Sequence, residues 1–178
     1  MLLIRHATAH DVSRLPAIEH SAGQIFRSLP DLAWIADDDV QSEQRHLELI
    51  ALGRQKGLAL IAEDDTGQPV AFLNGEVAAD GLHLWQMAVH PTVQRRRIGQ
   101  RLLGRAADHA EALGLDALTL TTFRHVAWNA PYYQRLGFTL IAPAALNARL
   151  RAILEAEARA GLPASRRCAM CYKLKNRP

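Results

Sequence analysis

The amino-acid sequence predicts one mixed α/β domain that covers residues 1–178. The chain has 178 residues, which lies within the usual size range of a single domain. Hydrophobic residues make up 49% of it, a share typical of a chain that folds around a core and not of a disordered one. Short apolar runs alternate with segments of helical periodicity in the order βααβββαβαβαβ, and this interleaving indicates the α/β class.

The first half of the chain is predicted to contain two helices and four strands. Apolar residues three and four positions apart mark the helices, and Gly53 is the expected end of the second. Tight turns at 64–67 and 79–81 separate the last three strands, which we therefore expect to form an antiparallel meander. The expected elements are a strand at Leu2–Arg5, a helix from Thr8 or Asp11 to about Phe26, a helix that begins at Ser42, and strands at Leu58–Ala62, Pro69–Val77 and Leu82–Val89.

The second half is predicted to alternate helices and strands. Gly114 ends the first of these helices, and the strand after it should run parallel to the strand before the helix. Asn129 is the expected N-cap of a short helix with Pro131 in its first turn. The expected elements are helices at Ile98–Leu113, from Asn129 to Leu136 and at Leu146–Ala160, and strands at Leu118–Thr121, Phe138–Ile141 and Arg167–Leu174.

The charge of the chain does not indicate a nucleic-acid partner. The net charge is only +3, and the basic residues gather at 95–105 and 166–177 without the interleaved aromatic side chains of a single-strand binder. An anionic ligand of modest size at 95–105 fits this distribution better than a duplex.

Membrane insertion and metal binding are not expected either. The N-terminus lacks the apolar stretch of a signal peptide, and no apolar run is long enough to span a bilayer, so we expect a cytoplasmic protein. Cys168 and Cys171 are the only cysteines. Residues three apart on the predicted last strand point to opposite faces, which argues against a shared metal ion.

The arginine run VQRRRIGQRLL, from Val93 to Leu103, lies where a predicted strand leads into a predicted helix. Backbone N–H groups in the first turn of a helix have no intrahelical partner, and the helix dipole adds partial positive charge there. Gly99 would allow a bulky anion to approach the backbone, and the arginines add bidentate donors. The sequence therefore predicts a site for a phosphate-bearing ligand, and a pyrophosphate fits best.

Two motifs resemble signatures of the GNAT superfamily of N-acetyltransferases. The first places Val89, Pro91, Gln94, Arg97 and Gly99 at the spacing of that family's acetyl-CoA loop. The second is NAPYYQRLGF at 129–138, in which a tyrosine precedes Leu-Gly-Phe. The resemblance implies a central mixed, mostly antiparallel sheet of about seven strands flanked by helices, with a splayed parallel pair of strands at the cofactor site.

The resemblance implies that acetyl-CoA is the co-substrate and that no metal is needed. Backbone groups of one strand would bind its pantetheine arm, the loop would hold its pyrophosphate, and an arginine would reach its adenosine end. Asn129 is expected to cap its helix, which is compatible with a contact to the cofactor. The implied cofactor-binding residues are Met87, Ala88, Val89, Gln94, Arg95, Arg96, Arg97, Ile98, Gly99, Gln100, Arg101 and Asn129.

The sequence departs from the family pattern at two positions. Arg97 stands where the family usually has its first glycine, and we expect a right-handed helical backbone there, since a left-handed one would strain an arginine. Gln86 stands where many relatives carry a glutamate that serves as general base. A glutamine cannot take up a proton usefully, so the base must be sought elsewhere.

For proton transfer, Tyr133 matches the family tyrosine and is the candidate acid, the alternative being a packed aromatic side chain. The candidate bases are Glu76, His125 and, more weakly, His83, with an ordered water as the alternative. His125 could equally be a solvated loop residue and Glu76 part of a solvated strand face.

The acceptor should be bound by the first two helices and the segment between them. The expected substrate-binding residues are Phe26, Trp34 and Tyr132, and acids at 37–39 form either an acidic mouth for a cation or a solvated loop. We expect transfer of an acetyl group to a primary amine of a small molecule. The alternatives are a peptide or protein N-acetyltransferase and a non-catalytic acyl-CoA-binding regulatory module, and a homodimer through the last strand stays open.

Overall fold

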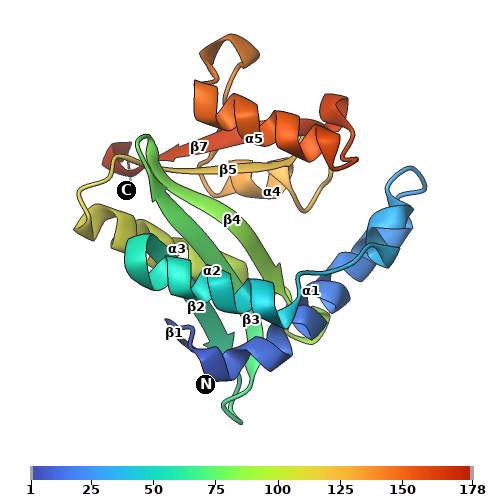
Figure 1. Cartoon of the computed structure of the whole chain (residues 1–178), viewed down its shortest axis with the longest axis vertical. Coiled ribbons are helices and arrows are strands. Elements are labelled where there is room, and N and C mark those ends of the chain that lie inside the picture. The colour runs from blue at the N-terminus through green and yellow to red at the C-terminus, as the bar shows by residue number, and fades with distance from the viewer. Residues whose placement is uncertain (1, 177–178) are drawn as a thin grey trace. The chain divides into compact units, whose positions relative to one another are not determined.

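The computed structural model describes residues 2–176, and it confirms the predicted order of strands and α-helices (Figure 1). The strands of these residues form a seven-stranded sheet in the order β1-β2-β3-β4-β5-β7-β6. The elements are β1 (Leu3–His6), α1 (Leu15–Gly23), α2 (Glu43–Lys56), β2 (Gly57–Glu63), β3 (Pro69–Ala78), β4 (Gly81–Val89), α3 (Ile98–Ala112), β5 (Ala117–Phe123), α4 (Ala130–Arg135), β6 (Thr139–Leu140), α5 (Ala148–Arg159) and β7 (Arg167–Lys173).

The chain forms two compact units. Unit 1 consists of Met1–Glu76 and Gln86–Ala106, and unit 2 consists of Val77–Trp85 and Ala107–Pro178. Strands β3 and β4 and helix α3 each contribute residues to both units.

In unit 1, helices α1 and α2 cover one face of strands β1, β2 and β3, in front of the strands in Figure 1. β2 pairs antiparallel with both β1 and β3. Apolar side chains from the helices and the strands close over this face and exclude water. The buried members of this cluster are Ala7, Val12, Leu15, Ile18, Ile50, Ala59, Ile61, Phe72 and Ala88.

Two details of the helices in unit 1 differ from the prediction. The first helix is interrupted: 3₁₀ turns at Ala9–Arg14 and Gln24–Ser28 flank α1. Pro16 explains the first break, because it has no N–H to continue a hydrogen-bonded helix from the preceding turn. Gly53 does not end α2, which continues to Lys56; a Cβ at Gly53 would lie 2.8 Å from the backbone nitrogen of Ala59, so the glycine permits close packing of the helix on β2.

A partly buried ion pair closes the N-terminal end of unit 1. The Arg5 guanidinium donates to both carboxylate oxygens of Asp11, each at 2.9 Å, and its Nε donates to Glu63 at 2.8 Å. Asp11 also accepts from the backbone N–H of Thr8 at 2.7 Å. Burial acts to raise the pKa of Asp11, but the hydrogen bonds from Arg5 and Thr8 outweigh it and lower the pKa.

In unit 2, α5 lies in front of β5 and β7 in Figure 1. β4 and β5 pair parallel, with Leu82 opposite Leu118, which confirms the predicted parallel pair, and β7 pairs antiparallel with β5 and β6. Divergence of the parallel pair beyond this register stays a prediction. The predicted strand at 138–141 is reduced to two residues, and α5 starts two residues later than predicted because the Asn147 side chain caps it, accepting from the Leu150 N–H at 2.9 Å.

The connection from β4 to α3 contradicts the expectation for Arg97. Its φ is 60°, and that of Arg95 is 62°, so both arginines adopt the left-handed conformation that favours glycine. The helix begins only at Ile98. Arg97 therefore lies before the helix, and its backbone is left-handed. A glycine, which the family usually has at this position, adopts this conformation without strain, whereas an arginine adopts it at a conformational cost.

Replacing Arg97 by glycine should stabilise the fold. A left-handed conformation costs an L-residue about 1–2 kcal/mol, so we expect Arg97→Gly to raise the free energy of unfolding by about 1 kcal/mol in urea titrations. Arg96→Gly is the matched control, because Arg96 is not left-handed and the glycine there should only add unfolded-state entropy and destabilise. Shifts of the same sign and size in both variants would contradict the strain at Arg97.

Asp11→Asn should destabilise the protein by about 2 kcal/mol at neutral pH, because the charged hydrogen bonds to Arg5 are lost. Since the folded-state pKa of Asp11 is lowered, its contribution is present above the unfolded-state pKa and is lost as the pH falls through the folded-state value. Urea titrations should therefore show wild type and variant converging below about pH 4. A difference in the free energy of unfolding between wild type and Asp11→Asn that does not change with pH would contradict this. Asp39→Asn, which changes an exposed residue, is the control.

Candidate functional site

The loop before α3 presents exposed cationic side chains around the free N–H groups of the helix. Arg95, Arg96 and Arg97 are exposed, whereas Ile98 and Gly99 are buried in the first turn of α3. A left-handed residue followed by helical ones turns successive backbone N–H groups toward one side, which forms an anion-binding concavity. The loop therefore combines backbone donors, the helix dipole and guanidinium groups, as the binding of a pyrophosphate requires.

Two loop residues predicted to bind the cofactor are engaged within the protein. The Gln94 side-chain amide donates to the Val89 carbonyl at 3.1 Å, so it holds the loop in shape. A guanidinium N–H of Arg101 donates to the Leu2 carbonyl at 3.0 Å, which ties α3 to the residue before β1. The Gln100 side chain is exposed.

The end of β4 precedes this loop. Ala88 points into the core of unit 1, whereas Met87 and Val89 are half-buried. Only the backbone of Ala88 is therefore available to a ligand, as expected for binding an extended arm in the manner of a strand.

In unit 2, Tyr133 lies in a group of aromatic rings on α4 and the segment after it. Its ring packs edge-on against Phe138, with ring centroids 5.5 Å apart, and against Tyr132 at 5.4 Å. Burial raises the pKa of Tyr133 far above its usual range, and that of Tyr132 to a smaller extent. Both hydroxyls are therefore protonated at neutral pH and can donate a proton or a hydrogen bond.

Asn129 precedes α4, as predicted, but its side chain does not cap the helix. No side-chain cap hydrogen bond forms, and within residues 2–176 its buried Oδ1 has no hydrogen-bond partner. A buried acceptor without a donor is unfavourable unless a ligand or water supplies one. This orphaned oxygen suits an amide N–H of an extended arm.

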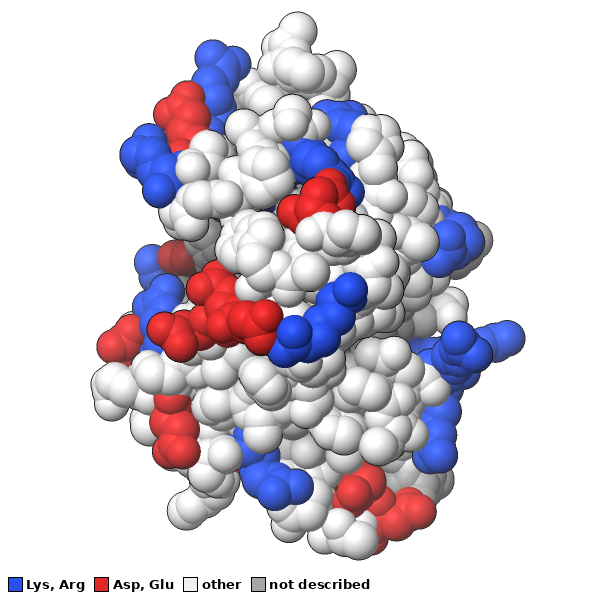
Figure 2. Space-filling view, turned by 90° about the vertical axis from the view of Figure 1, so that its right-hand side faces the viewer, with Lys and Arg blue, Asp and Glu red and all other residues white. Residues whose placement is uncertain are grey.

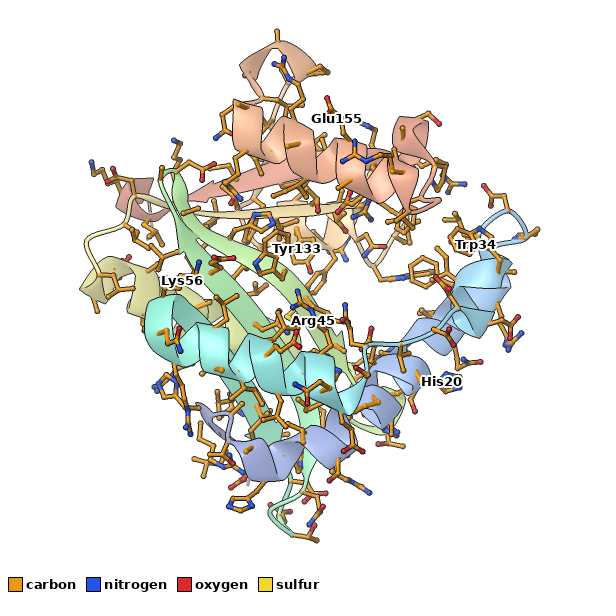
Figure 3. All side chains as sticks on the ribbon, viewed as in Figure 1. His20, Trp34, Arg45, Lys56, Tyr133 and Glu155 are labelled. Carbon is orange, nitrogen blue, oxygen red and sulfur yellow. The ribbon has the colours of Figure 1, made fainter. Side chains whose placement is uncertain are left out.

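The candidate bases are in different environments. The Glu76 carboxylate forms an ion pair with Lys56, with 2.6 Å between its Oε1 and the Lys56 Nζ. Lys56 is the last residue of α2, as Figure 3 shows. His125 is exposed on the bend after β5. His83 is buried, and its Nδ1 lies 3.0 Å from the Thr119 hydroxyl, so it is part of the interior of unit 2.

The predicted acceptor-binding side chains Phe26 and Trp34 belong to the segment that follows α1. Phe26 is half-buried, and Trp34 is 42% exposed on the 3₁₀ turn Ala33–Asp37 (Figure 3). Asp37 accepts from Arg27 at 3.2 Å, so the charge of one of the three acids is balanced within the segment. Tyr132, the third predicted residue, is on α4 of unit 2.

Sequence reasoning missed one polar side chain in the core of unit 1. Asn74 on β3 is 5% exposed, and its Oδ1 accepts no hydrogen bond from any described residue. The buried Oε1 of Gln86 on β4 is in the same state. A lone asparagine in the apolar strand PVAFLNGEVA was the available signal.

On the face shown in Figure 2, Lys and Arg lie in small groups among Asp and Glu. This face therefore has no extended basic surface of the kind that binds nucleic acid. The described residues include no group of three or more His, Cys, Asp or Glu arranged to hold a metal ion. None of the helices in the described part of the chain is long and apolar enough to cross a membrane.

Comparisons with known proteins agree with this architecture. A protein named IAA acetyltransferase from Azospirillum brasilense is 36% identical over 110 residues, which cover 62% of this chain and 61% of that protein. A coenzyme A complex of the PaiA N-acetyltransferase from Thermoplasma acidophilum has a TM-score of 0.72 at 17% identity, covering 97% of this chain and 99% of that one. The ribosomal-protein-S18-alanine N-acetyltransferase from Escherichia coli has a TM-score of 0.67 at 20% identity, covering 98% and 94%.

The profile of the Acetyltransferase (GNAT) family matches residues 24–138, a range that includes both sequence motifs and most of the sheet. This match covers more than half of the chain. The chain belongs to the GNAT family of acetyltransferases.

Proposed function

We propose that the protein transfers an acetyl group from acetyl-CoA to a primary amine of a small molecule. The observation that carries the proposal is the loop before α3, where left-handed Arg95 and Arg97 surround a free helix N-terminus in a member of the GNAT family. A coenzyme A complex of a protein with this fold supports the choice of cofactor.

Acetyl-CoA would supply an activated thioester, and the amine nitrogen would attack its carbonyl carbon. In this proposal, the arginine loop binds the pyrophosphate, the backbone of Met87–Val89 aligns the pantetheine arm, and the orphaned Oδ1 of Asn129 accepts one of its amide N–H groups. Backbone N–H groups of the strand would polarise the carbonyl.

Tyr133 is proposed as the proton donor to the departing thiolate. Its raised pKa keeps the hydroxyl protonated at working pH, which a general acid requires. Proton removal from the amine is assigned to Glu76 or His125. Glu76 is paired with Lys56, whereas His125 is exposed on its bend, and the variants Glu76→Gln and His125→Gln would distinguish the two candidates.

Gln86 favours a second function, a non-catalytic acyl-CoA-binding module, because it replaces the glutamate base of many relatives. Such a module would bind acetyl-CoA and release no thiol in the presence of amines. Loss of a dedicated base is nevertheless compatible with catalysis when the amine loses its proton through water.

Acetyl-CoA should raise the thermal unfolding midpoint, because a ligand that binds the native state stabilises it. Acetyl-pantetheine, which lacks the pyrophosphate, should bind more weakly than acetyl-CoA. The double variant Arg95→Gln/Arg97→Gln should lose about tenfold or more in affinity for acetyl-CoA and little for acetyl-pantetheine.

Calorimetric titrations of both ligands would measure this difference. Arg54→Gln, on the exposed side of α2, is the matched control and should bind as the wild type does. An equal loss for the two ligands, or no midpoint rise with saturating acetyl-CoA, would overturn the assignment of the loop.

Tyr133→Phe should lower kcat by about 10²-fold or more while leaving acetyl-CoA affinity unchanged, since only the hydroxyl is removed. Because the pKa of Tyr133 lies far above its usual range, the ratio of wild-type to variant kcat should be constant between about pH 6 and pH 9. Steady-state thiol release measures both quantities. Tyr132→Phe is the comparison, and an unchanged rate in Tyr133→Phe would remove this tyrosine from the mechanism.

A further inference from the structure

One half-buried arginine of unit 2 has no acidic partner. Arg124 follows β5, and its backbone N–H donates to the Arg166 carbonyl at 2.7 Å, so the pairing of β5 with β7 continues to this residue. Among residues 2–176, none accepts a hydrogen bond from the Arg124 guanidinium or forms an ion pair with it. Removal of water from a charged group is unfavourable unless a partner replaces it, so this guanidinium calls for an explanation.

The acid whose charge acts at this end of the sheet is already paired. Burial raises the pKa of the Cys168 thiol, and the guanidinium groups of Arg124 and Arg167 act to lower it. The negative charge that acts on the same thiol is that of Glu157. Glu157 accepts two hydrogen bonds from Arg167, at 2.8 and 3.0 Å, and a third from Thr121. The charge of Arg167 is therefore balanced, whereas that of Arg124 is not.

The two arginines lie on opposite faces of the sheet. The guanidinium carbon of Arg167 is 4.7 Å from the centre of the Phe123 ring, on the face to which α5 brings its glutamate. Successive side chains of a strand alternate between the faces, so Arg124 shares the other face with Thr122 and with Cys168 opposite it. The glutamate of α5 therefore lies on the wrong face to pair with Arg124.

The face that carries Arg124 also carries the aromatic group of the proposed acid. Tyr172 lies opposite Leu118, which is an even number of residues from Arg124, so its side chain is on the same face. The Tyr172 ring packs on Phe138 with 5.3 Å between centroids, and Phe138 packs on Tyr133 at 5.5 Å. An anion bound by Arg124 would therefore lie on the face of β5 and β7 against which Tyr133 is packed.

The charge and shape of the guanidinium define the anion that fits it. Its parallel N–H donors match the two oxygens of a carboxylate. One unbalanced positive charge also matches the single charge of a carboxylate, whereas a phosphate monoester carries about −1.5 to −2 at neutral pH. Arg166, opposite Arg124, has a partner of its own, so it does not add a second free cation. These properties favour a carboxylate over a phosphate.

We propose that Arg124 binds a carboxylate of the acceptor, so that the acceptor is an amine that also carries a carboxylate. The carboxylate is not changed by the reaction; its binding fixes the position of the amine and selects the substrate. The inference rests on the proposed function, because it names the chemical class of the acceptor in that reaction. Arg124 is then a specificity-determining residue of unit 2, outside both sequence motifs.

Matched pairs of amines measure the proposed preference without acetyl transfer. Glycine, β-alanine, γ-aminobutyrate and L-phenylalanine would each be titrated by calorimetry against the corresponding carboxamide, in the presence of coenzyme A. In at least one pair the wild type should bind the carboxylate about tenfold or more tightly than the carboxamide, because only the carboxylate pairs with the guanidinium. Equal affinities within every pair, or no binding of any carboxylate, would overturn the inference.

Variants assign the preference to the side chain. Arg124→Gln should reduce the preference for the carboxylate to near unity and leave the affinity for the carboxamide unchanged. Arg124→Lys, which keeps the charge but not the paired donors, should retain an intermediate preference. Arg159→Gln, at an exposed position of α5, is the matched control and should behave as the wild type. A wild-type preference in Arg124→Gln would overturn the inference.

Two further measurements exclude other roles for Arg124. Because its guanidinium is unpaired, Arg124→Gln should not lower the thermal unfolding midpoint of the protein without ligands, and a lowered midpoint would overturn the inference in favour of a structural role. The variant should also bind acetyl-CoA and 3′-dephospho-acetyl-CoA as the wild type does. A loss of affinity confined to acetyl-CoA would overturn the inference and assign Arg124 to the 3′-phosphate of the cofactor.

Failure of the proposed function would be visible separately, as the absence of acetyl-CoA binding by the wild type.

Discussion

The reversal of the chain between β4 and α3 is the constraint on which the proposed cofactor site depends. The hydrogen bond from the His90 N–H to the Val70 carbonyl holds the end of the strand, and Ile98, the first residue of the helix, is buried. Gln94 bridges back to the Val89 carbonyl, and left-handed turns at Arg95 and Arg97 complete the reversal. Because the helix begins immediately after these residues, its free N–H groups and the guanidinium groups occupy the same end of α3.

Two kinds of polar group lie in unit 1. Backbone and guanidinium donors at the end of β4 suit an anion, whereas the buried side-chain oxygens of Asn74 and Gln86 accept no hydrogen bond from the described residues. In unit 2, burial among aromatic rings keeps Tyr133 protonated. Donors for a phosphate and a neutral acid are groups that the proposed acetyl transfer would use.

The order of elements could be predicted from the sequence because periodicity and turn residues are local properties. The parallel pairing of β4 with β5 followed from the helix between them, and Gly114 and Gly137 mark helix ends in left-handed conformations, as expected. The role of Gly53 could not be predicted, because the glycine permits close packing against β2, a contact between elements that a local pattern does not show.

Prediction of the site was limited for a similar reason. The arginine loop was located by its motif, but the backbone of Arg97 was predicted wrongly, since propensity disfavours a left-handed arginine and the turn overrides it. The asparagine in the apolar strand at 69–78 is visible in the sequence, but whether Asn74 is paired depends on its neighbours across the sheet, and these are set by register. The assignments of Tyr133, Glu76 and His125 stay predictions.

Thiol release over a panel of primary amines tests the central claim of acetyl transfer most directly. The account predicts that coenzyme A is released in proportion to an acetylated amine identified by mass spectrometry, and only when a primary amine is present. Acetyl-CoA that binds tightly but yields no thiol with any amine of the panel would contradict it and favour the regulatory module.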